Sequence, residues 1–150
     1  MAVITGSYGF AGISASIKGF GGFADLGNGA GAAEEGITIE PVDDQSTAEI
    51  GADGSAWHSL SASTAHNLTV RLAKLSPVNT TLMVMASLQQ SSPKLNGKNV
   101  ISIRDSDNGD YILCEGVAFT RWAPLNYGKT AGTNEWTFFA SSVQRVLGGL

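Results

Sequence analysis

The chain has 150 residues, with 9 Lys or Arg and 13 Asp or Glu, so its formal net charge is −4 at pH 7. This length suits one hydrophobic core and is too short for two ordinary domains, so we expect a single domain over residues 1–150. The charge excludes a surface built to grip nucleic acid, which needs clustered Lys and Arg. Only 15% of the residues are charged and 43% are hydrophobic, a composition that favours a subunit of an assembly.

The beginning of the chain predicts a strand followed by an irregular segment. Residues 12–18 alternate Ile and Ala with Ser and Lys, the pattern of a strand with two different faces. Residues 19–36 contain seven glycines together with Phe20 and Phe23. This composition predicts a flexible, Gly-rich loop that becomes ordered against a neighbour.

Short strands separated by turn residues follow the loop. Alternation of apolar and polar residues predicts strands at 36–42, 46–51, 55–63 and 67–74. Turn residues separate these strands at Asp43-Asp44, at 52–54 and at Ala65-His66. The spacing predicts an antiparallel meander.

One helix is expected over residues 77–90. Ser76 supplies a hydroxyl N-cap, and Pro77 suits the first helical position because its missing N–H has no intrahelical partner there. The apolar residues with helical spacing are Val78, Leu82, Met85 and Ala86. We expect this side of the helix to pack flat on the sheet.

The last third of the chain predicts a second hairpin and two further elements. Ile101 and Ile103 begin a strand, residues 105–110 form its turn, and residues 110–122 return with Gly116 as a bulge site. Trp136 and Phe138 mark a last aromatic strand, and residues 140–150 predict a short helix. The fold class is therefore mainly β, a β-sandwich or partial barrel of antiparallel strands with one main α-helix.

The sequence contains no convincing catalytic or metal-binding pattern. The acidic turn at 105–110 lacks the EF-hand Gly at position six and has Gly116 where that pattern needs Glu. His58 and His66 lack a second ligand at metal-binding spacing, and we expect both to be solvated. Cys114, the single cysteine, lies in an apolar run and is interpreted as a buried thiol. We expect no enzyme activity, no metal and no cofactor.

The order of several motifs resembles the tail tube proteins of bacteriophages over most of the chain. After the Gly-rich loop these motifs are EEGITIE (34–40), GADGS (51–55), NLTVRLAKLSPVNTTL (67–82) and EWTFFASS (135–142). The resemblance implies a virion structural protein, a subunit of stacked six-membered rings in which each copy gives strands to a continuous inner β-barrel. DNA is ejected through such a tube without specific binding.

The resemblance also implies a location and partners. The location is the virion tail, assembled in the host bacterial cytoplasm. The partners are other copies of the chain, tape measure, baseplate and tail terminator proteins, and a sheath if the tail contracts. No membrane insertion is expected, since no window approaches the roughly 20 apolar residues of a membrane span and the N-terminus lacks the features of a signal peptide.

Six residues are candidates for roles in such a tube. An acidic lumen repels phosphate, which makes Glu40 and Glu49 candidates for lining it. Mobile segments order on a partner, so Phe20 and Phe23 of the Gly-rich loop and the Asp43-Asp44 turn are candidates for contacts between stacked rings.

Two alternatives stay open at this point. A tube protein of a related contractile injection or secretion system shares the same implied fold. A monomeric β-sandwich carbohydrate-binding module or small hydrolase belongs to another class, and would bind its ligand without polymerising.

Overall fold

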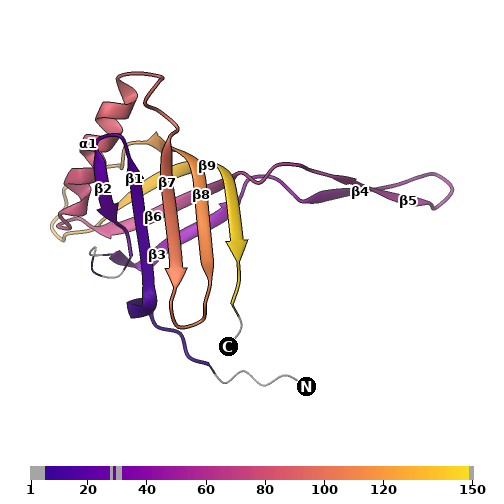
Figure 1. Ribbon diagram of the computed structural model, residues 1–150, viewed down its shortest axis with the longest axis horizontal. Coiled ribbons are helices and arrows are strands. Elements are labelled where there is room, and N and C mark those ends of the chain that lie inside the picture. Colours follow the sequence, from indigo (N-terminus) through magenta and orange to yellow (C-terminus); the bar gives the residue numbers. More distant parts are fainter. Residues whose placement is uncertain (1–5, 28, 30–31, 149–150) are drawn as a thin grey trace.

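A computed structural model of the chain describes residues 6–27, 29 and 32–148, and for residues 32–35 it describes the backbone alone. The elements of this described part are η1 (Phe10–Gly12), β1 (Ile13–Gly19), β2 (Gly22–Asp25), β3 (Ala32–Pro41), β4 (Ser46–Ile50), β5 (Ala56–Leu60), β6 (His66–Ala73), α1 (Val78–Gln90), β7 (Asn99–Asp105), β8 (Tyr111–Arg121) and β9 (Thr133–Val146). The predicted fold class, mainly antiparallel β with one main helix, is confirmed (Figure 1).

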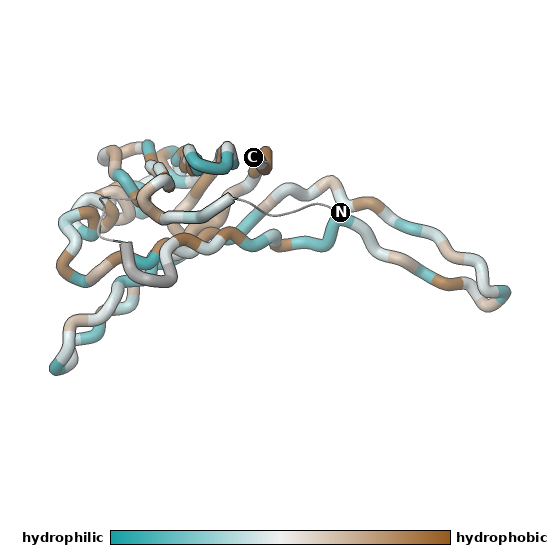
Figure 2. The backbone as a smooth tube through the Cα atoms, turned by 90° about the horizontal axis from the view of Figure 1, so that it is seen from below, coloured by the Kyte–Doolittle hydropathy of each residue, from teal (hydrophilic) through white to brown (hydrophobic). Residues whose placement is uncertain are grey.

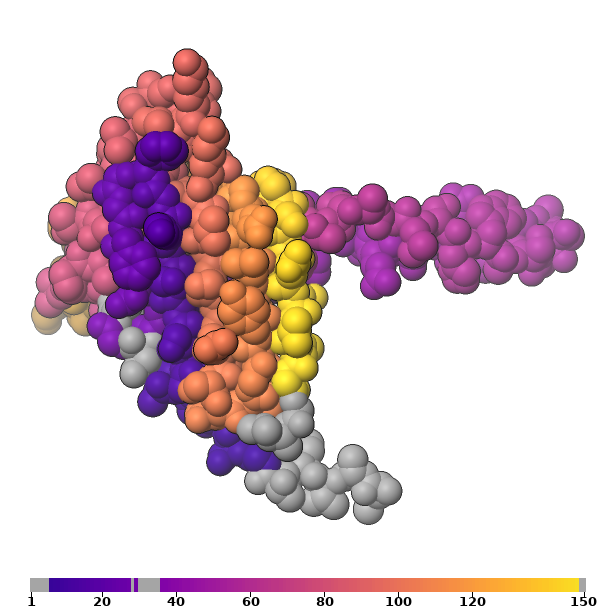
Figure 3. Space-filling model, in the orientation of Figure 1, coloured from indigo at the N-terminus to yellow at the C-terminus, as the bar shows by residue number. Residues whose placement is uncertain are grey.

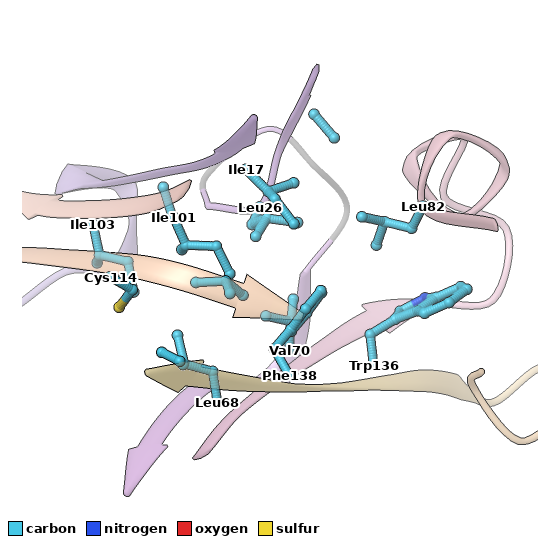
Figure 4. Close-up of a cluster of buried hydrophobic side chains, with 14 of the residues drawn as sticks. Ile17, Leu26, Leu68, Val70, Leu82, Ile101, Ile103, Cys114, Trp136 and Phe138 are labelled. Atoms are coloured by element: carbon cyan, nitrogen blue, oxygen red, sulfur yellow. The ribbon is translucent and has the colours of Figure 1, made fainter. Parts of the chain in front are cut away.

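Seven strands form one sheet in the order β2-β1-β7-β8-β9-β6-β3, with antiparallel pairing throughout. The sheet curls into a half-barrel, so that β6 and β3 cross behind β1, β7 and β8 (Figure 1). The apolar core fills the inside of this curl, and Figure 4 shows side chains from both walls meeting there. Leu68, Val70 and Leu72 of β6 are at most 1% exposed, whereas Thr69 and Arg71 between them are partly exposed. The alternation predicted for this strand is therefore confirmed.

The predicted meander over residues 36–74 is wrong, although all four of its strands exist. β3 pairs with β6, and β4 pairs with β5 in a separate two-stranded sheet. The four strands thus follow one long hairpin. β4 and β5 pair next to its tip, and β3 and β6 pair at its base. Residues 42–65, here called the arm, project from the half-barrel (Figure 1).

The loop expected at 19–36 contains regular structure, so that prediction is wrong for part of the segment. β2 pairs with β1, and β3 begins at Ala32. Leu26 is fully buried, which anchors the segment in the core. Gly21 has φ +97 and lies so close to α1 that an added Cβ would sit 3.2 Å from the Met85 Cα, which explains one glycine of the run by a close approach. Residues 28, 30 and 31 lie outside the described residues.

The helix predicted at 140–150 is wrong within the described residues, where β9 continues to Val146. This part of β9 pairs with β8, from Cys114↔Val143 to Tyr111↔Val146. Gly116, with φ +62, forms the predicted bulge, since Asn99 pairs with Val117 and Ile101 pairs with Cys114. The paired strands change their inward face near this bulge, so Ala140 and Val143 are both buried at a spacing of three. The predicted helix would place Val143, Val146 and Leu147 on one face, whereas only Val143 of the three is buried, and Val146 and Leu147 are 62% and 73% exposed.

The helix α1 packs at one end of the half-barrel beside β2 (Figure 1), and its apolar side is the predicted one. It begins at Val78 with Pro77 as its N-cap, so the predicted N-cap at Ser76 is wrong by one residue, although the Ser76 hydroxyl accepts a hydrogen bond from the Val78 N–H at 3.3 Å. Buried residues of α1 are Leu82, Met85, Ala86 and Gln89. Figure 4 shows Leu82 reaching from α1 toward the core near Trp136.

Candidate assembly surfaces

The arm is the most exposed regular element of the described chain, since every residue of β4 and β5 is exposed. The pairs Ser46↔Leu60, Ala48↔His58 and Ile50↔Ala56 place their side chains on one side of the arm, here called its apolar side. Ile50 and Leu60 are 77% and 80% exposed. Figure 2 shows the two strands leaving the half-barrel with hydrophobic positions along them. An isolated two-stranded hairpin is marginally stable in water, so this side needs a cover.

The other side and the tip of the arm are held by polar contacts. The indole Nε1 of Trp57 donates to Glu49 Oε2 at 3.1 Å across the strand pair. At the tip, Asp53 Oδ1 accepts hydrogen bonds from the Ser55 hydroxyl at 2.6 Å and the Ser55 N–H at 3.0 Å. These bonds favour the carboxylate and hold the pKa of Asp53 below its usual value. The predicted turn at 52–54 is confirmed, with Gly54 at φ +87.

The outer face of β3, β6 and β9 is mainly polar, although Phe139, which pairs with Asn67 and is 39% exposed, also lies on it. Its polar residues, here called the polar outer face, are Thr38, Glu40, Asn67, Thr69, Arg71, Glu135 and Thr137. Cross-strand pairing places Thr38, Thr69 and Thr137 in one row. Arg71 donates to the Thr38 hydroxyl at 2.9 Å and lies 3.6 Å from Glu135. This ion pair offsets one acidic charge, whereas Glu40 adds a negative charge to the face.

A groove of about 610 Å³ lies between the C-terminal end of α1 and the end of β8. We call it the end groove. Its lining includes Ala86, Gln89, Pro93, Phe119, Arg121 and Trp122. Trp122 is 50% exposed there. The end groove therefore combines an aromatic wall with an exposed guanidinium.

The sequence-predicted site residues lie in three separate places. Glu40 belongs to the polar outer face, whereas Glu49 lies on the arm in the other sheet. Phe20 and Phe23, 47% and 59% exposed, lie in the β1–β2 turn and on the edge strand β2. Asp43 and Asp44 are exposed at the base of the arm. Phe20 and Phe23 are thus neighbours in the chain only, and the acidic candidates lie on other elements.

Reasoning from sequence missed the apolar side of the arm and the end groove. The only local signal for the arm was an apolar residue on each side of the Asp53-Gly54 turn, at Ile50 and Leu60. The groove joins α1 to the end of β8, so no local pattern could have located it.

No group of three or more His, Cys, Asp or Glu in the described ranges could hold a metal ion. Asp105 instead closes the β7–β8 turn, its Oδ1 accepting from the Asp107 N–H at 3.0 Å. His66, expected to be solvated, is 7% exposed and its Nδ1 lies 2.8 Å from the Thr64 carbonyl oxygen. Burial raises the pKa of the Cys114 thiol to about 11, which suits a core residue. Among the described helices, none is long and apolar enough to cross a membrane.

Three solved structures share this fold. A chain of the extended-state sheath/tube terminator of PVC, an extracellular contractile injection system, is similar with TM-score 0.64 and 14% identity, covering 96% of this chain and 99% of that one. A chain of the extended PVC sheath-tube complex is similar with TM-score 0.57 and 17% identity, covering 90% and 88%. A chain of the anti-feeding prophage cap, the AFP tube terminating cap, gives TM-score 0.54 and 10% identity, covering 98% and 95%. At these identities the likeness concerns the fold.

The sequence places the chain more narrowly. The model of the family described as Bacteriophage PhiTE tail tube protein matches residues 5–148, and the chain belongs to this family. The resemblance to phage tail tube proteins is thereby confirmed. Among curated proteins, none matches the chain.

Proposed function

We propose that this tail tube protein is a virion subunit that assembles into stacked hexameric rings and forms the conduit for DNA ejection into the host. The observation that carries the proposal is the arm, a two-stranded hairpin with Ile50 and Leu60 exposed. A monomer gains nothing from presenting such a surface to water, whereas an assembly covers it. The arm then contacts another copy of the chain.

Open strand edges support the same proposal. β2 and β3 form the two edges of the seven-stranded sheet, and the described sheet pairs neither edge with a further strand. Unpaired edges promote association, and closing a sheet around a ring pairs each edge with the next subunit. Strands of each copy then contribute to one ring-wide inner β-barrel.

The polar outer face suits a surface along which DNA slides without binding. Its residues are mainly hydroxyl and amide groups, and its Arg71 lies beside Glu135. A surface without free cations gives phosphate no counter-charge, and carboxylates repel it. Glu40, which lies on this face, and Glu49, which lies on the arm instead, remain our candidates for lining the lumen.

Contacts between rings form the other part of the proposal. Head-to-tail stacking needs two different patches, one on each end of the subunit. Phe20 and Phe23 provide exposed aromatic side chains, and Asp43 and Asp44 provide exposed carboxylates elsewhere. We place these residues at ring-to-ring contacts.

The remaining partners follow from the proposed place in the virion tail. Tape measure, baseplate and tail terminator proteins meet the tube, with a sheath in a contractile tail, and assembly occurs in the host cytoplasm. The family and the similar structures consist of structural proteins of tubes and their terminators, so we propose no enzyme activity.

Negative-stain electron microscopy of the purified protein over a range of concentrations tests the proposal. Stacked rings of uniform width with six-fold end views are the expected result. A protein that stays monomeric, even when preassembled tail tips are added to start growth, would contradict it.

A tube protein of a contractile injection system is the second candidate function. It is favoured by the similar structures, which come from PVC and the anti-feeding prophage. Particles that contain tubes and sheath but no capsid or DNA would indicate this function. The carbohydrate-binding or hydrolase alternative is not retained, because the chain belongs to a tail tube family.

A further inference from the structure

Acidic and basic residues are segregated along this chain. Residues 19–70 contain eight Asp or Glu and no Lys or Arg, whereas residues 72–104 contain four Lys or Arg and no Asp or Glu. The arm alone, residues 42–65, has four carboxylates and no Lys or Arg. The remaining nine Asp and Glu balance the nine Lys and Arg, so the arm accounts for the formal net charge of −4.

The end groove has the complementary character. Phe119 and Trp122 give it an aromatic wall, and none of its lining residues is acidic. Arg121 lines the groove and is exposed, and the exposed Lys94 follows Pro93 in the adjoining loop. An acidic segment with an apolar side therefore matches this groove in both charge and hydrophobicity.

We propose that the arm of one copy docks by its apolar side into the end groove of a second copy, with the acidic tip beside Arg121. This inference rests on the proposed function and names the surface that receives the arm. The contact must join two copies, because the arm points away from α1 and from the end of β8 (Figures 1 and 3). A chain therefore cannot fill its own groove.

The spacing of residues supports one orientation of the docked arm. Ile50 ends β4 on the apolar side, and Asp53 follows three residues later in the turn at the tip. In the groove, Arg121 directly precedes Trp122. In the docked orientation that we propose, Ile50 lies on the aromatic wall and the acidic tip faces the guanidinium, so that each charge is paired where it loses water.

A charge swap tests the contact. We expect Asp53→Lys and Arg121→Asp each to raise the concentration needed for tube formation about tenfold or more, because each places like charges together. The combined variant Asp53→Lys/Arg121→Asp should recover most of the loss. Lys129→Asp is the matched control, since it reverses an exposed charge on the segment after β8 but outside the groove lining.

A cross-link provides a second measurement that does not depend on charge. Ala52→Cys at the tip and Thr120→Cys in the groove lining should form a disulfide between copies within assembled tubes, while the buried Cys114 stays unreactive. Tubes that form normally with Arg121→Asp and without this cross-link would overturn the docking and leave the tube function standing. A wild-type chain that never assembles overturns the tube function, and the docking with it.

Discussion

Gln89 of α1 and Asn99 of β7 exchange two hydrogen bonds of 2.7 Å in the core. The Gln89 amide donates to Asn99 Oδ1, and the Asn99 amide donates to Gln89 Oε1. The two side chains are 2% and 0% exposed. Further bonds to the carbonyls of Phe20 and Val117 satisfy their remaining donors, so the pair joins the helix to three parts of the sheet.

This amide pair predicts an asymmetric response to mutation. Gln89→Leu removes one partner and leaves Asn99 with an unsatisfied buried carbonyl, which we expect to lower the free energy of unfolding by about 1–3 kcal/mol. The double variant Gln89→Leu/Asn99→Leu should lose less than the sum of the two single variants. Urea unfolding of the subunit at low concentration measures these values. Additive losses would show that the two amides act independently.

Cys114 predicts a loss of stability in alkaline solution. Its pKa is about 11 in the folded chain and 9.0 in the reference state, so the unfolded chain releases the proton first as the pH rises. The contribution of the protonated thiol to the free energy of unfolding is fully present below pH 9. It is lost between pH 9 and about 11, at a slope of at most about 1.4 kcal/mol per pH unit. Cys114→Ala should remove this slope, and parallel pH profiles for the two proteins would contradict the prediction.

The lumen proposal predicts a kinetic effect without a structural one. Tubes of Glu40→Lys/Glu49→Lys should keep their width, and virions that contain them should release DNA more slowly because lysine attracts phosphate. Time-resolved dye entry to the released DNA measures the rate. Asp107→Lys, in the β7–β8 turn, provides a control with one reversed charge. Release at the wild-type rate would remove both glutamates from the lumen.

The ring-to-ring proposal predicts folded subunits that fail to stack. Phe20→Ser/Phe23→Ser removes two exposed aromatic side chains and should abolish tubes while changing the free energy of unfolding by less than about 1 kcal/mol. Asp43→Asn/Asp44→Asn should act likewise if the acidic turn meets cations in the next ring. Leu125→Ser, at a residue 64% exposed, is the control for losing exposed apolar area. Tubes formed normally by both double variants would move the contact elsewhere.

Deleting residues 22–33 is not a suitable test of that contact. The deletion would remove β2 and the fully buried Leu26 together with the exposed Phe23. Loss of tubes would then report loss of the core. Point substitutions on the exposed side of the turn and strand separate the two effects.

Local patterns predicted the strands better than their partners. Alternation located β6 and the turn residues located the arm tip, because both signals depend on neighbouring residues. The pairing of β3 with β6 joins residues at least 25 positions apart, and a meander has the same local pattern. At the end of β9, the spacing of Val143, Val146 and Leu147 fits a helix face, whereas the pairing of this segment with β8 depends on residues distant in the chain.

The candidate surfaces were predictable only in part. Carboxylates could be identified from the sequence, so Glu40 and Glu49 were candidates before their positions were known. Whether an alternating strand is covered by a sheet or open to water is decided by tertiary structure, which is why the exposure of Ile50 and Leu60 was missed.

The long hairpin makes the arm removable. Pro41 and His66 pair directly across β3 and β6, so a two-residue Asn-Gly turn between them could replace the arm and leave the half-barrel in place. A subunit shortened in this way keeps its end groove but lacks the arm that docks into the groove of another copy. Added in small amounts to wild-type protein, it should join a growing tube and then stop growth in one direction. The fold thus contains a simple means of setting tube length by mixing two forms of one chain.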